Sequence, residues 1–260
     1  MRCYIILAHP EKNSFNTSLA KKFESTFSSL GHEVRFKDLY EKKFNPLLSR
    51  NDYPQCKDYD HVQFPQAQLE SFGLKNISQE IREEHQNLLW AELVIIQFPM
   101  WLYSMPAILK GWCERVLTEG FAHQPSKNKW FEKGGLAGTR LLLSITMNGK
   151  MESFTKKGRH GKIETILWPI MNAFWFSGFE IIKPFLSFNV VKQTDEYRNA
   201  ILEHATEYAL SAKTEPLIKI HPLNDYDKEG RLKAKVKPIT PAQQTSSDNF
   251  DFLTSTKFKN

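Results

Sequence analysis

The chain alternates short apolar runs with segments in which apolar residues recur at helical spacing. Cys3–Ala8 is an apolar run that predicts a strand close to the first residue. Apolar residues then recur at every fourth position from Phe15 to Phe27, which predicts a helix ending near Leu30-Gly31. Glu33–Leu39 alternates apolar and polar side chains and predicts a second strand. This order of strand, helix and strand is typical of the opening of a doubly wound sheet.

The same alternation continues to about residue 211. It predicts three further strands, over residues 93–98, 140–146 and 180–188, and four further helices, over 76–91, 106–117, 163–178 and 195–211. Asn76 and Gln79 have capping-box spacing, Pro106 suits the first position of its helix, and Asp195 is the predicted cap of the last one. We therefore expect an α/β fold with a five-stranded, doubly wound parallel sheet.

Some segments lack any periodicity. Residues 44–75 contain three prolines and many aromatic residues, and we expect them to form a long insertion loop with a covering or functional role. Residues 121–138 form a second predicted loop. From Thr214 onward the helix and strand patterns break down and basic residues become frequent. We expect one domain over residues 1–222 and a charged, partly disordered tail over 223–260.

Composition narrows the class of protein. The net charge of +6 and the pI near 9.0 fit a nucleic acid or an anionic small molecule as ligand, but no nucleic-acid-binding signature occurs and the charge is dispersed. The three cysteines are far apart in sequence, which predicts reduced thiols and a cytoplasmic protein. No apolar run approaches the roughly 18 residues of a membrane span, so we expect no membrane segment and no nucleic-acid partner.

The chemistry is expected at the carboxyl ends of the parallel strands, where residues 9–16, 99–103 and 146–149 lie. These loops contain neither a Ser-His-acid set nor an acidic pair, and no cluster of metal ligands, so we expect no metal. They offer hydroxyls, amides, aromatic rings and backbone N–H groups, which suit a phosphate and a flat ring system. A chain without redox groups of its own depends on a cofactor for such chemistry.

Two of these loops allow a structural as well as a functional interpretation. The segment His9–Asn16 opens a helix whose N–H groups attract a pyrophosphate, or else it is a polar loop that only caps the helix. The segment Pro99–Pro106 is an aromatic-rich turn between prolines. It either flanks one edge of an isoalloxazine ring or packs into the core, as most aromatic residues do.

The sequence resembles the NAD(P)H:quinone oxidoreductase (DT-diaphorase) family of flavodoxin-like enzymes over roughly residues 1–225. The matching stretches are LAH and SFN within 7–16, DLYEKKFNPLLSR at 38–50, QFP at 63–65, QFPMWLYSMPAILKGWCERVL at 97–117, LSIT at 143–146, RHGKIETILWPI at 159–170 and SGFEIIKP at 177–184. The resemblance implies a flavodoxin-like fold and a homodimer with FAD at the subunit interface. It also implies ping-pong transfer of two electrons from NADH or NADPH to a quinone.

The resemblance also implies the site residues. Those that match the family's FAD contacts are His9, Ser14, Phe15, Asn16, Ser18, Gln63, Pro99, Met100, Trp101, Leu102, Tyr103, Thr146, Met147, Asn148, Gly149, Arg198 and Leu202. Those that match the acceptor pocket are His123, Gln124 and Pro125. His160 matches a family histidine linked to charge relief at the flavin, and Phe154 occupies the place of a family tyrosine, which makes both the candidate catalytic positions.

Departures from the family pattern bear on the acceptor side. The loop after the fourth predicted strand reads Thr146-Met-Asn-Gly149, where the family is richer in glycine. Phe154 has no hydroxyl and cannot donate a hydrogen bond, so a tyrosine–histidine relay is not available in the family's form. Leu102 replaces an aromatic residue often found under the ring. We expect hydride transfer to survive, and His160→Ala to slow flavin reduction while leaving FAD bound.

Two alternative functions are open at this point. Some relatives are ancillary, flavin-bound subunits of potassium-efflux systems, but these are shorter and lack the insertion and the tail. Co-purification with the cytosolic domain of a transporter would favour that function. Salt-dependent binding to random DNA would instead favour a nucleic-acid-binding protein.

Overall fold

The computed structural model describes residues 1–56 and 60–239. It divides into two compact units, Met1–Ile218 and Lys219–Asn260. The second unit contains a short 3₁₀ turn at Leu223–Asp225 and an isolated antiparallel bridge between Tyr226 and Leu232. The boundary predicted between residues 222 and 223 stays a prediction, and most of the predicted disordered tail lies outside the described residues.

A parallel sheet forms the centre of the first unit. Its strands follow the order β2-β1-β3-β4-β5, with β6 also paired to β4, and every pairing is parallel. This order is that of a flavodoxin-like sheet, and the α/β class predicted from the sequence is confirmed. The strands are β1 Arg2–Leu7, β2 Glu33–Asp38, β3 Leu93–Pro99, β4 Arg140–Thr146, β5 Glu180–Ile181 and β6 Phe185–Ser187.

The last predicted strand differs from the sequence prediction. A single strand is expected over residues 180–188, but two short strands, β5 and β6, pair in succession along β4. Ile182, Lys183 and Pro184 separate them. Because proline has no N–H to donate, it interrupts the ladder of hydrogen bonds and the chain resumes pairing only at Phe185.

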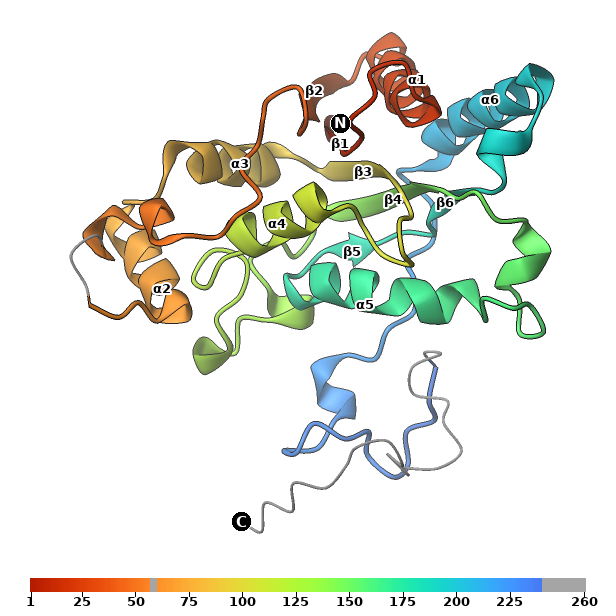
Figure 1. The fold of residues 1–260 in the computed structure, drawn as a ribbon. Coiled ribbons are helices and arrows are strands. Elements are labelled where there is room, and N and C mark those ends of the chain that lie inside the picture. The colour runs from red at the N-terminus through yellow and green to blue at the C-terminus, as the bar shows by residue number, and fades with distance from the viewer. Residues whose placement is uncertain (57–59, 240–260) are drawn as a thin grey trace. The chain divides into compact units, whose positions relative to one another are not determined.

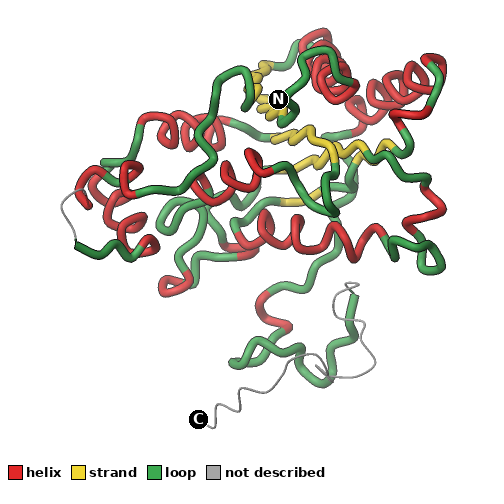
Figure 2. The backbone as a smooth tube through the Cα atoms, in the orientation of Figure 1, coloured by secondary structure: helices red, strands yellow, loops and turns green. Residues whose placement is uncertain are grey.

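Helices cover both faces of the sheet (Figure 1). On one face α1 and α6 lie side by side, and on the other lie α3, α4 and α5. Figure 2 shows the loops that join strands to helices at the ends of the strands. The helices are α1 Phe15–Ser29, α2 Phe64–Leu74, α3 Gln79–Trp90, α4 Ala107–Val116, α5 Ile163–Phe176 and α6 Asp195–Ser211.

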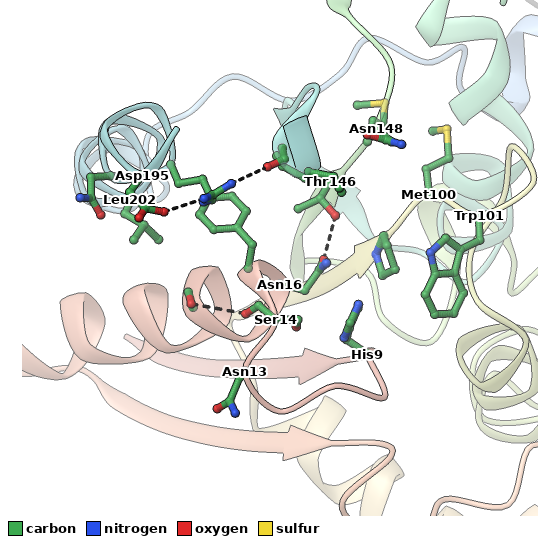
Figure 3. A pocket seen from close by; sticks show the side chains of 18 residues that line it. His9, Asn13, Ser14, Asn16, Met100, Trp101, Thr146, Asn148, Asp195 and Leu202 are labelled. Atoms are coloured by element: carbon green, nitrogen blue, oxygen red, sulfur yellow. Dashed lines mark hydrogen bonds and ion pairs between the residues drawn. The ribbon is translucent and has the colours of Figure 1, made fainter. Parts of the chain in front are cut away.

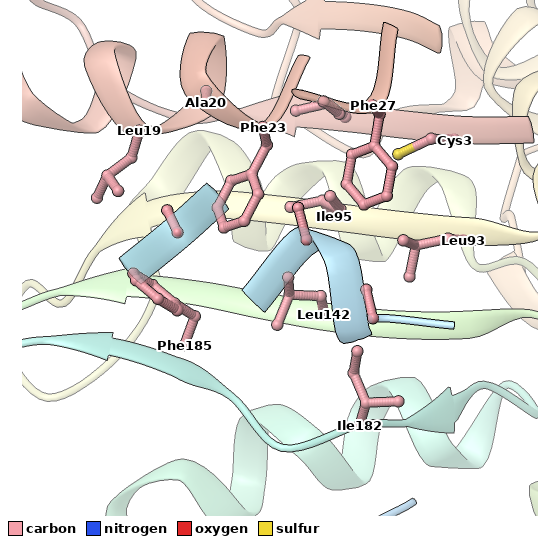
Figure 4. Packing of buried hydrophobic residues seen from close by; sticks show 14 of the residues in the cluster. Cys3, Leu19, Ala20, Phe23, Phe27, Leu93, Ile95, Leu142, Ile182 and Phe185 are labelled. Atoms are coloured by element: carbon pink, nitrogen blue, oxygen red, sulfur yellow. The ribbon is translucent and has the colours of Figure 1, made fainter. Parts of the chain in front are cut away.

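Successive side chains of β1 point to opposite faces of the sheet, so β1 contributes to the packing on both faces. Cys3, Ile5 and Leu7 point into the apolar cluster under α1 and α6, together with Phe23 and Phe27 of α1 (Figure 4). All five of these side chains are fully buried. Burial of this size supplies most of the favourable free energy of folding, since each large apolar side chain contributes roughly 1.5–3 kcal/mol.

The opposite face of β1 carries a buried polar group. Tyr4 donates a hydrogen bond to Glu84 of α3 over 2.7 Å, and Trp112 of α4 donates to the same carboxylate oxygen over 2.8 Å. Lys37 of β2 lies 2.8 Å from the other oxygen of Glu84. The buried carboxylate thereby fixes α3 and α4 against the sheet, because an unpaired buried charge is strongly destabilising.

The helix starts also correct the sequence predictions. α3 begins after Ser78, with neither Asn76 nor Ser78 making a side-chain cap, and α4 begins after Pro106. At α6 the cap is Thr194, whose hydroxyl accepts from the N–H of Tyr197, so Asp195 is the first helical residue and not the cap. The threonine was overlooked because both residue types favour this position.

The predicted structureless segment 44–75 is partly helical. It contains 3₁₀ turns at Arg50–Asp52 and Pro54–Cys56 and the helix α2. α2 has Phe64 and Pro65 at its start, and its apolar side chains are too unevenly spaced to give a clear helical period. A small separate core, built around Tyr53 and Ile81, holds this segment to α3.

The start of the insertion segment lies directly against α4. A Cβ atom on Gly111 would come within 2.1 Å of the carbonyl oxygen of Pro46, so only glycine fits there. Arg115, one turn further along α4, forms buried ion pairs with Asp52 and Glu80 and donates to the carbonyl of Asn45. These contacts hold the first part of the insertion against α4.

Candidate functional site

A cavity of about 800 Å³ opens at the carboxyl ends of β1, β3 and β4 (Figure 3). This is the point where the strand order reverses, between β1 and β3, and the place where ligands bind in sheets of this kind. Its lining residues come from the loops that follow these strands and from the segment that leads into α6. They are His9, Asn13, Ser14, Phe15, Asn16, Ser18, Pro99, Met100, Trp101, Thr146, Met147, Asn148, Val190, Val191, Asp195, Arg198, Asn199 and Leu202.

The N-terminus of α1 forms one wall. Ser14 caps the helix, and its side-chain oxygen accepts from the N–H of Thr17 over 3.2 Å. The first turn of α1 carries no acidic residue. The first N–H groups of a helix have no partner within it and carry a partial positive charge, so this end of α1 is suited to an anion such as a phosphate.

Asn16 is held by two side chains at the carboxyl ends of β3 and β4. Gln97 Nε2 donates to Asn16 Oδ1 over 2.8 Å, and Thr146 Oγ1 donates to the same oxygen over 3.1 Å (Figure 3 draws the second bond). All three side chains are buried. Since the amide oxygen accepts both bonds, the amide nitrogen of Asn16 keeps its two donors for a ligand.

Gln97 was not among the residues predicted from the sequence. The signal for it was a single amide side chain inside the apolar strand Leu93–Phe98. It is fully buried, at 0% exposure, and a buried polar group in a central strand needs a partner. Its partner is Asn16, 81 positions earlier in the chain, and only the folded sheet brings the two together.

The loop after β3 supplies the apolar and aromatic side. Pro99, Met100 and Trp101 line the cavity, and the Trp101 ring lies 5.8 Å from the ring of His9 across its mouth. Leu102 and Tyr103 do not line it. Leu102 is 97% exposed, and its predicted place at the ring stays a prediction.

The loop after β4 forms the third wall. Thr146, Met147 and Asn148 line the cavity. The N–H of Met147 donates to the carbonyl of Ser187 over 2.8 Å, which fixes the loop to β6. Gly149 follows outside the lining, and a Cβ on it would come within 2.7 Å of the Phe154 ring. The close approach of this ring explains why the one glycine of the loop is at position 149.

The two predicted catalytic positions are neighbours. The rings of Phe154 and His160 are 4.8 Å apart, and both lie against Gly149. His160 Nδ1 lies 2.8 Å from the hydroxyl of Tyr103, and Arg159 Nε donates to His160 Nε2 over 3.3 Å. His160 is thus placed beside two of the loops that line the cavity, although it does not line the cavity itself.

The far end of the cavity is formed by α6 and the segment before it. Arg198 donates to the carbonyls of Gln193 and Val190, over 2.7 and 3.2 Å, and pairs with Asp195 at 2.5 Å (Figure 3). Its guanidinium group therefore orders the entry to the helix as well as facing the cavity. Leu202 lies one turn further on and adds an apolar surface.

Several lining residues were missed from the sequence. Asn13, Val190, Val191, Asp195 and Asn199 have no motif that marks them as ligand-binding. Asn13 lies in the loop between β1 and α1. The other four enter the cavity because β6 pairs with β4 and places the segment after it there, a consequence of the sheet order that no local pattern encodes.

The predicted residues Gln63, His123, Gln124 and Pro125 lie elsewhere. Gln63 precedes α2 and lines a separate cavity with Cys56. His123 lines a cavity of about 400 Å³ with residues of α4 and α5. Burial lowers the pKa of His123, while Glu119, 3.2 Å from its ring, acts in the opposite direction. Within one chain these residues do not meet the main cavity.

The lining of the main cavity fits a flavin nucleotide. The α1 N-terminus, the free amide donors of Asn16 and the guanidinium group of Arg198 suit phosphates and polar edges, and Pro99–Trp101 suit a flat ring. Among residues 1–56 and 60–239 no group of three or more metal-ligating side chains gathers, and no helix there is long and apolar enough to span a membrane.

Comparison with known proteins agrees with this geometry. Residues 1–211 match a protein family described by its flavodoxin-like fold. The chain is 37% identical over 204 residues to NAD(P)H dehydrogenase (quinone) 1 of Rattus norvegicus, covering 78% of this chain and 74% of the rat protein. It is 35% identical over 215 residues to the ribosyldihydronicotinamide dehydrogenase-like protein traD of Penicillium crustosum, covering 80% of each.

A solved structure shares most of the fold. A candidate quinone reductase from Klebsiella pneumoniae superimposes with a TM-score of 0.87 at 28% identity, over 92% of this chain and 96% of that one. The fold and the cavity define a flavodoxin-like protein of the flavin-dependent oxidoreductase class. Within that class the chain belongs to the NAD(P)H:quinone oxidoreductase family, which confirms the family predicted from the sequence.

Proposed function

We propose that this protein is an FAD-dependent NAD(P)H:quinone oxidoreductase that reduces quinones by two electrons. The observation that carries the proposal is the meeting of three loops in one cavity: the capped N-terminus of α1, the aromatic turn after β3 and the loop after β4. The names of the related rat and fungal proteins support the reaction class.

Each wall has a part in holding FAD. The α1 N-terminus and the Asn16 amide bind the pyrophosphate, because both present N–H donors in a site without acidic residues in the first helical turn. Pro99–Trp101 would pack along the ring, and the backbone N–H groups of Asn148 and Gly149 would donate to its pyrimidine edge, since the N–H of Met147 is bonded to Ser187. Arg198 and Leu202 contact the adenosine end.

A flavin held by these residues would supply hydride transfer from NADH or NADPH and the two-electron reduction of a quinone. The protein's own residues orient these partners and exclude water from between them. We infer a ping-pong order, as the family resemblance implies, in which the nicotinamide and the quinone use the same place in turn.

We further propose a cytoplasmic homodimer in which the second subunit completes the site. Gln63 and the segment His123–Pro125 match the family's cofactor and acceptor contacts but do not reach the cavity of their own chain. A symmetric dimer that seats these residues against the cavity of the partner accounts for both facts.

Purified protein tests the proposal directly. We expect a yellow protein with a flavin absorption band, release of FAD identified by its mass, and menadione-dependent oxidation of NADPH well above that given by free FAD. Release of FMN instead of FAD would overturn the assignment of FAD as the cofactor. If the protein binds flavin but shows no activity above that of free FAD, the proposed enzymatic function is wrong. That result would favour a flavin-bound ancillary subunit.

A further inference from the structure

The turn Trp101–Ser104 holds its backbone in an unfavourable conformation. Trp101 and Ser104 exchange two backbone hydrogen bonds of 3.0 Å, and the two residues between them, Leu102 and Tyr103, have φ angles of 48° and 63°. Left-handed backbone at both central positions of a tight hairpin turn normally calls for Asn and Gly. Non-glycine residues there cost roughly 1–2 kcal/mol each, and such strain persists where the surroundings enforce it.

The surroundings that enforce it include His160. The turn directs the Tyr103 side chain to within 2.8 Å of His160 Nδ1, across 57 positions of sequence. Tyr103 remains 55% exposed, so its hydroxyl is accessible to a ligand as well. A phenol oxygen both accepts and donates, and one bond to His160 leaves the other capacity free.

Arg159 determines whether the Tyr103 hydroxyl is left to donate or to accept a further hydrogen bond. Its Nε–H donates to His160 Nε2 over 3.3 Å, and a guanidinium group can only donate. In the neutral ring of His160 the lone pair is therefore on Nε2 and the proton on Nδ1. The Nδ1–H then donates to the oxygen of Tyr103, which leaves the O–H of Tyr103 as a hydrogen-bond donor that points away from His160.

The pair stands between two walls of the cavity. Tyr103 follows the lining residues Pro99–Trp101, and His160 Nε2 lies 3.8 Å from the point where a Cβ on Gly149 would be, next to the lining residue Asn148. Phe154, which has no hydroxyl, fills the space on the other side of the His160 ring. The hydroxyl next to this histidine thus comes from the turn after β3.

We propose that the O–H of Tyr103, oriented through His160 by Arg159, donates a hydrogen bond to a carbonyl oxygen of the quinone acceptor. Addition of a hydride, which brings two electrons and one proton, converts the quinone into a hydroquinone monoanion. A proton from water then completes the hydroquinone. The donor at Tyr103 stabilises the oxygen on which the negative charge develops. This inference rests on the proposed function of the same site.

The direction of the hydrogen bonds from Arg159 through His160 to Tyr103 can be tested without measuring turnover. We expect ¹⁵N NMR of the purified protein at pH 8 to show His160 with its proton on Nδ1. Replacing Arg159 by Ala should move the proton toward Nε2, because the donor to Nε2 is lost. A proton on Nε2 in the unmodified protein would overturn the inference, whether or not the protein reduces quinones.

The role of the hydroxyl is tested with two acceptors. Tyr103→Phe should lower the rate of menadione reduction about tenfold, the loss of one hydrogen bond to a charged oxygen. It should leave the reduction of ferricyanide, which has no carbonyl oxygen, and the affinity for FAD within twofold of the original values. Tyr208→Phe is the matched control, since it removes a hydroxyl that bonds the Lys183 carbonyl away from the cavity.

The outcomes separate this inference from the proposed function. Equal rates for Tyr103→Phe and the unmodified protein with menadione, or equal losses with menadione and ferricyanide, would overturn the role of Tyr103 alone. Absence of menadione reduction in the unmodified protein would overturn the proposed function instead.

Discussion

Asn16 shows how a single side chain at the site depends on residues distant in sequence. Its amide oxygen accepts from Gln97 and Thr146, one from β3 and one from β4. Ser14 and Asn16 are recognisable in the sequence as polar residues at the start of a helix, but the direction of the Asn16 amide is set by Gln97. A residue that orients a ligand-binding group is as necessary to affinity as the group itself.

Gln97→Leu should weaken FAD binding about tenfold. The substitution removes the bond that orients Asn16, a loss of about 1.4 kcal/mol. Titration of the apoprotein with FAD, followed by quenching of flavin fluorescence, measures the effect. Ser144→Ala is the matched control, because Ser144 is equally buried and pairs in register with Gln97 on β4. Unchanged affinity for Gln97→Leu would contradict the role assigned to Asn16.

His85 is a buried histidine outside the site. Its Nε2 donates to the carbonyl of Val116 over 2.8 Å, and its ring stacks on Phe121 at 3.6 Å between centroids. Burial lowers the pKa of His85 to about 4. Below pH 6.5 the unfolded chain binds a proton at this residue that the native protein does not bind, so the native state loses stability as the pH falls from 6.5 to 4.

The free energy of unfolding should therefore fall by about 2 kcal/mol from this residue between pH 7 and pH 5. Urea denaturation at both pH values measures it. His85→Gln keeps a donor for the Val116 carbonyl and does not titrate, so its stability should depend less on pH by that amount. His61→Gln, at an exposed position, should keep the original pH dependence. Equal pH dependence of His85→Gln and the unmodified protein would refute the assignment.

At the scale of elements, α4 joins the insertion segment to the body of the fold. Gly111 permits the backbone at Pro46 to touch the helix, and Arg115 pairs with Asp52 and Glu80 beneath it. Arg115 and Asp52 are 3% and 4% exposed in their side chains, so this ion pair is screened little by solvent. α4 thus shares with α3 the contacts that hold this segment.

Arg115→Met should lower the free energy of unfolding by about 3–5 kcal/mol, because it leaves Asp52 buried without its partner. The exposed pair Lys110–Glu114 on the same helix provides the control, since its side chains are 58% and 49% exposed. Lys110→Met should change stability by less than about 1 kcal/mol. Denaturation by urea compares the two variants, and similar losses for both would disprove the structural role of the buried pair.

At the scale of the whole molecule, the main cavity of one chain does not include all of the residues that match the family's site. Gln63 and His123 line other cavities, of which the one at α4 and α5 is largely apolar in its surroundings, with Met105, Ile170 and Phe176. Apolar surface of this kind is favourably covered by another subunit.

Sedimentation equilibrium should accordingly give twice the chain mass of 30.3 kDa. Lys110→Glu together with Phe176→Asp, both in the α4–α5 cavity, should shift the protein toward the monomer, because charge is then buried in an apolar contact. Lys21→Glu, at an exposed position of α1 outside both of these cavities, should leave the mass unchanged. A monomeric unmodified protein would rule out a shared site.

Local sequence pattern predicted most of the elements. The apolar runs of β1, β3 and β4 and the periodicity of α1 are confirmed within a residue or two, because each is determined by burial on a face of fixed period. α2 was missed and the last strand was divided, because prolines and uneven apolar spacing hide the period. The predicted cap of α6, Asp195, is one residue too late, because Thr194 and Asp195 are adjacent and both residue types favour the capping position.

The sequence alone determined that this chain forms a doubly wound sheet and that the polar and aromatic loops of the cavity follow β1, β3 and β4. These properties depend on neighbours along the chain. Only the tertiary structure decided that Gln97 orients Asn16, that β6 carries Val190 and Asp195 to the cavity, and that Tyr103 faces His160. Such contacts join residues from about 40 to 80 positions apart, and hydrogen bonds at that separation depend on strand order and register, which no local pattern contains.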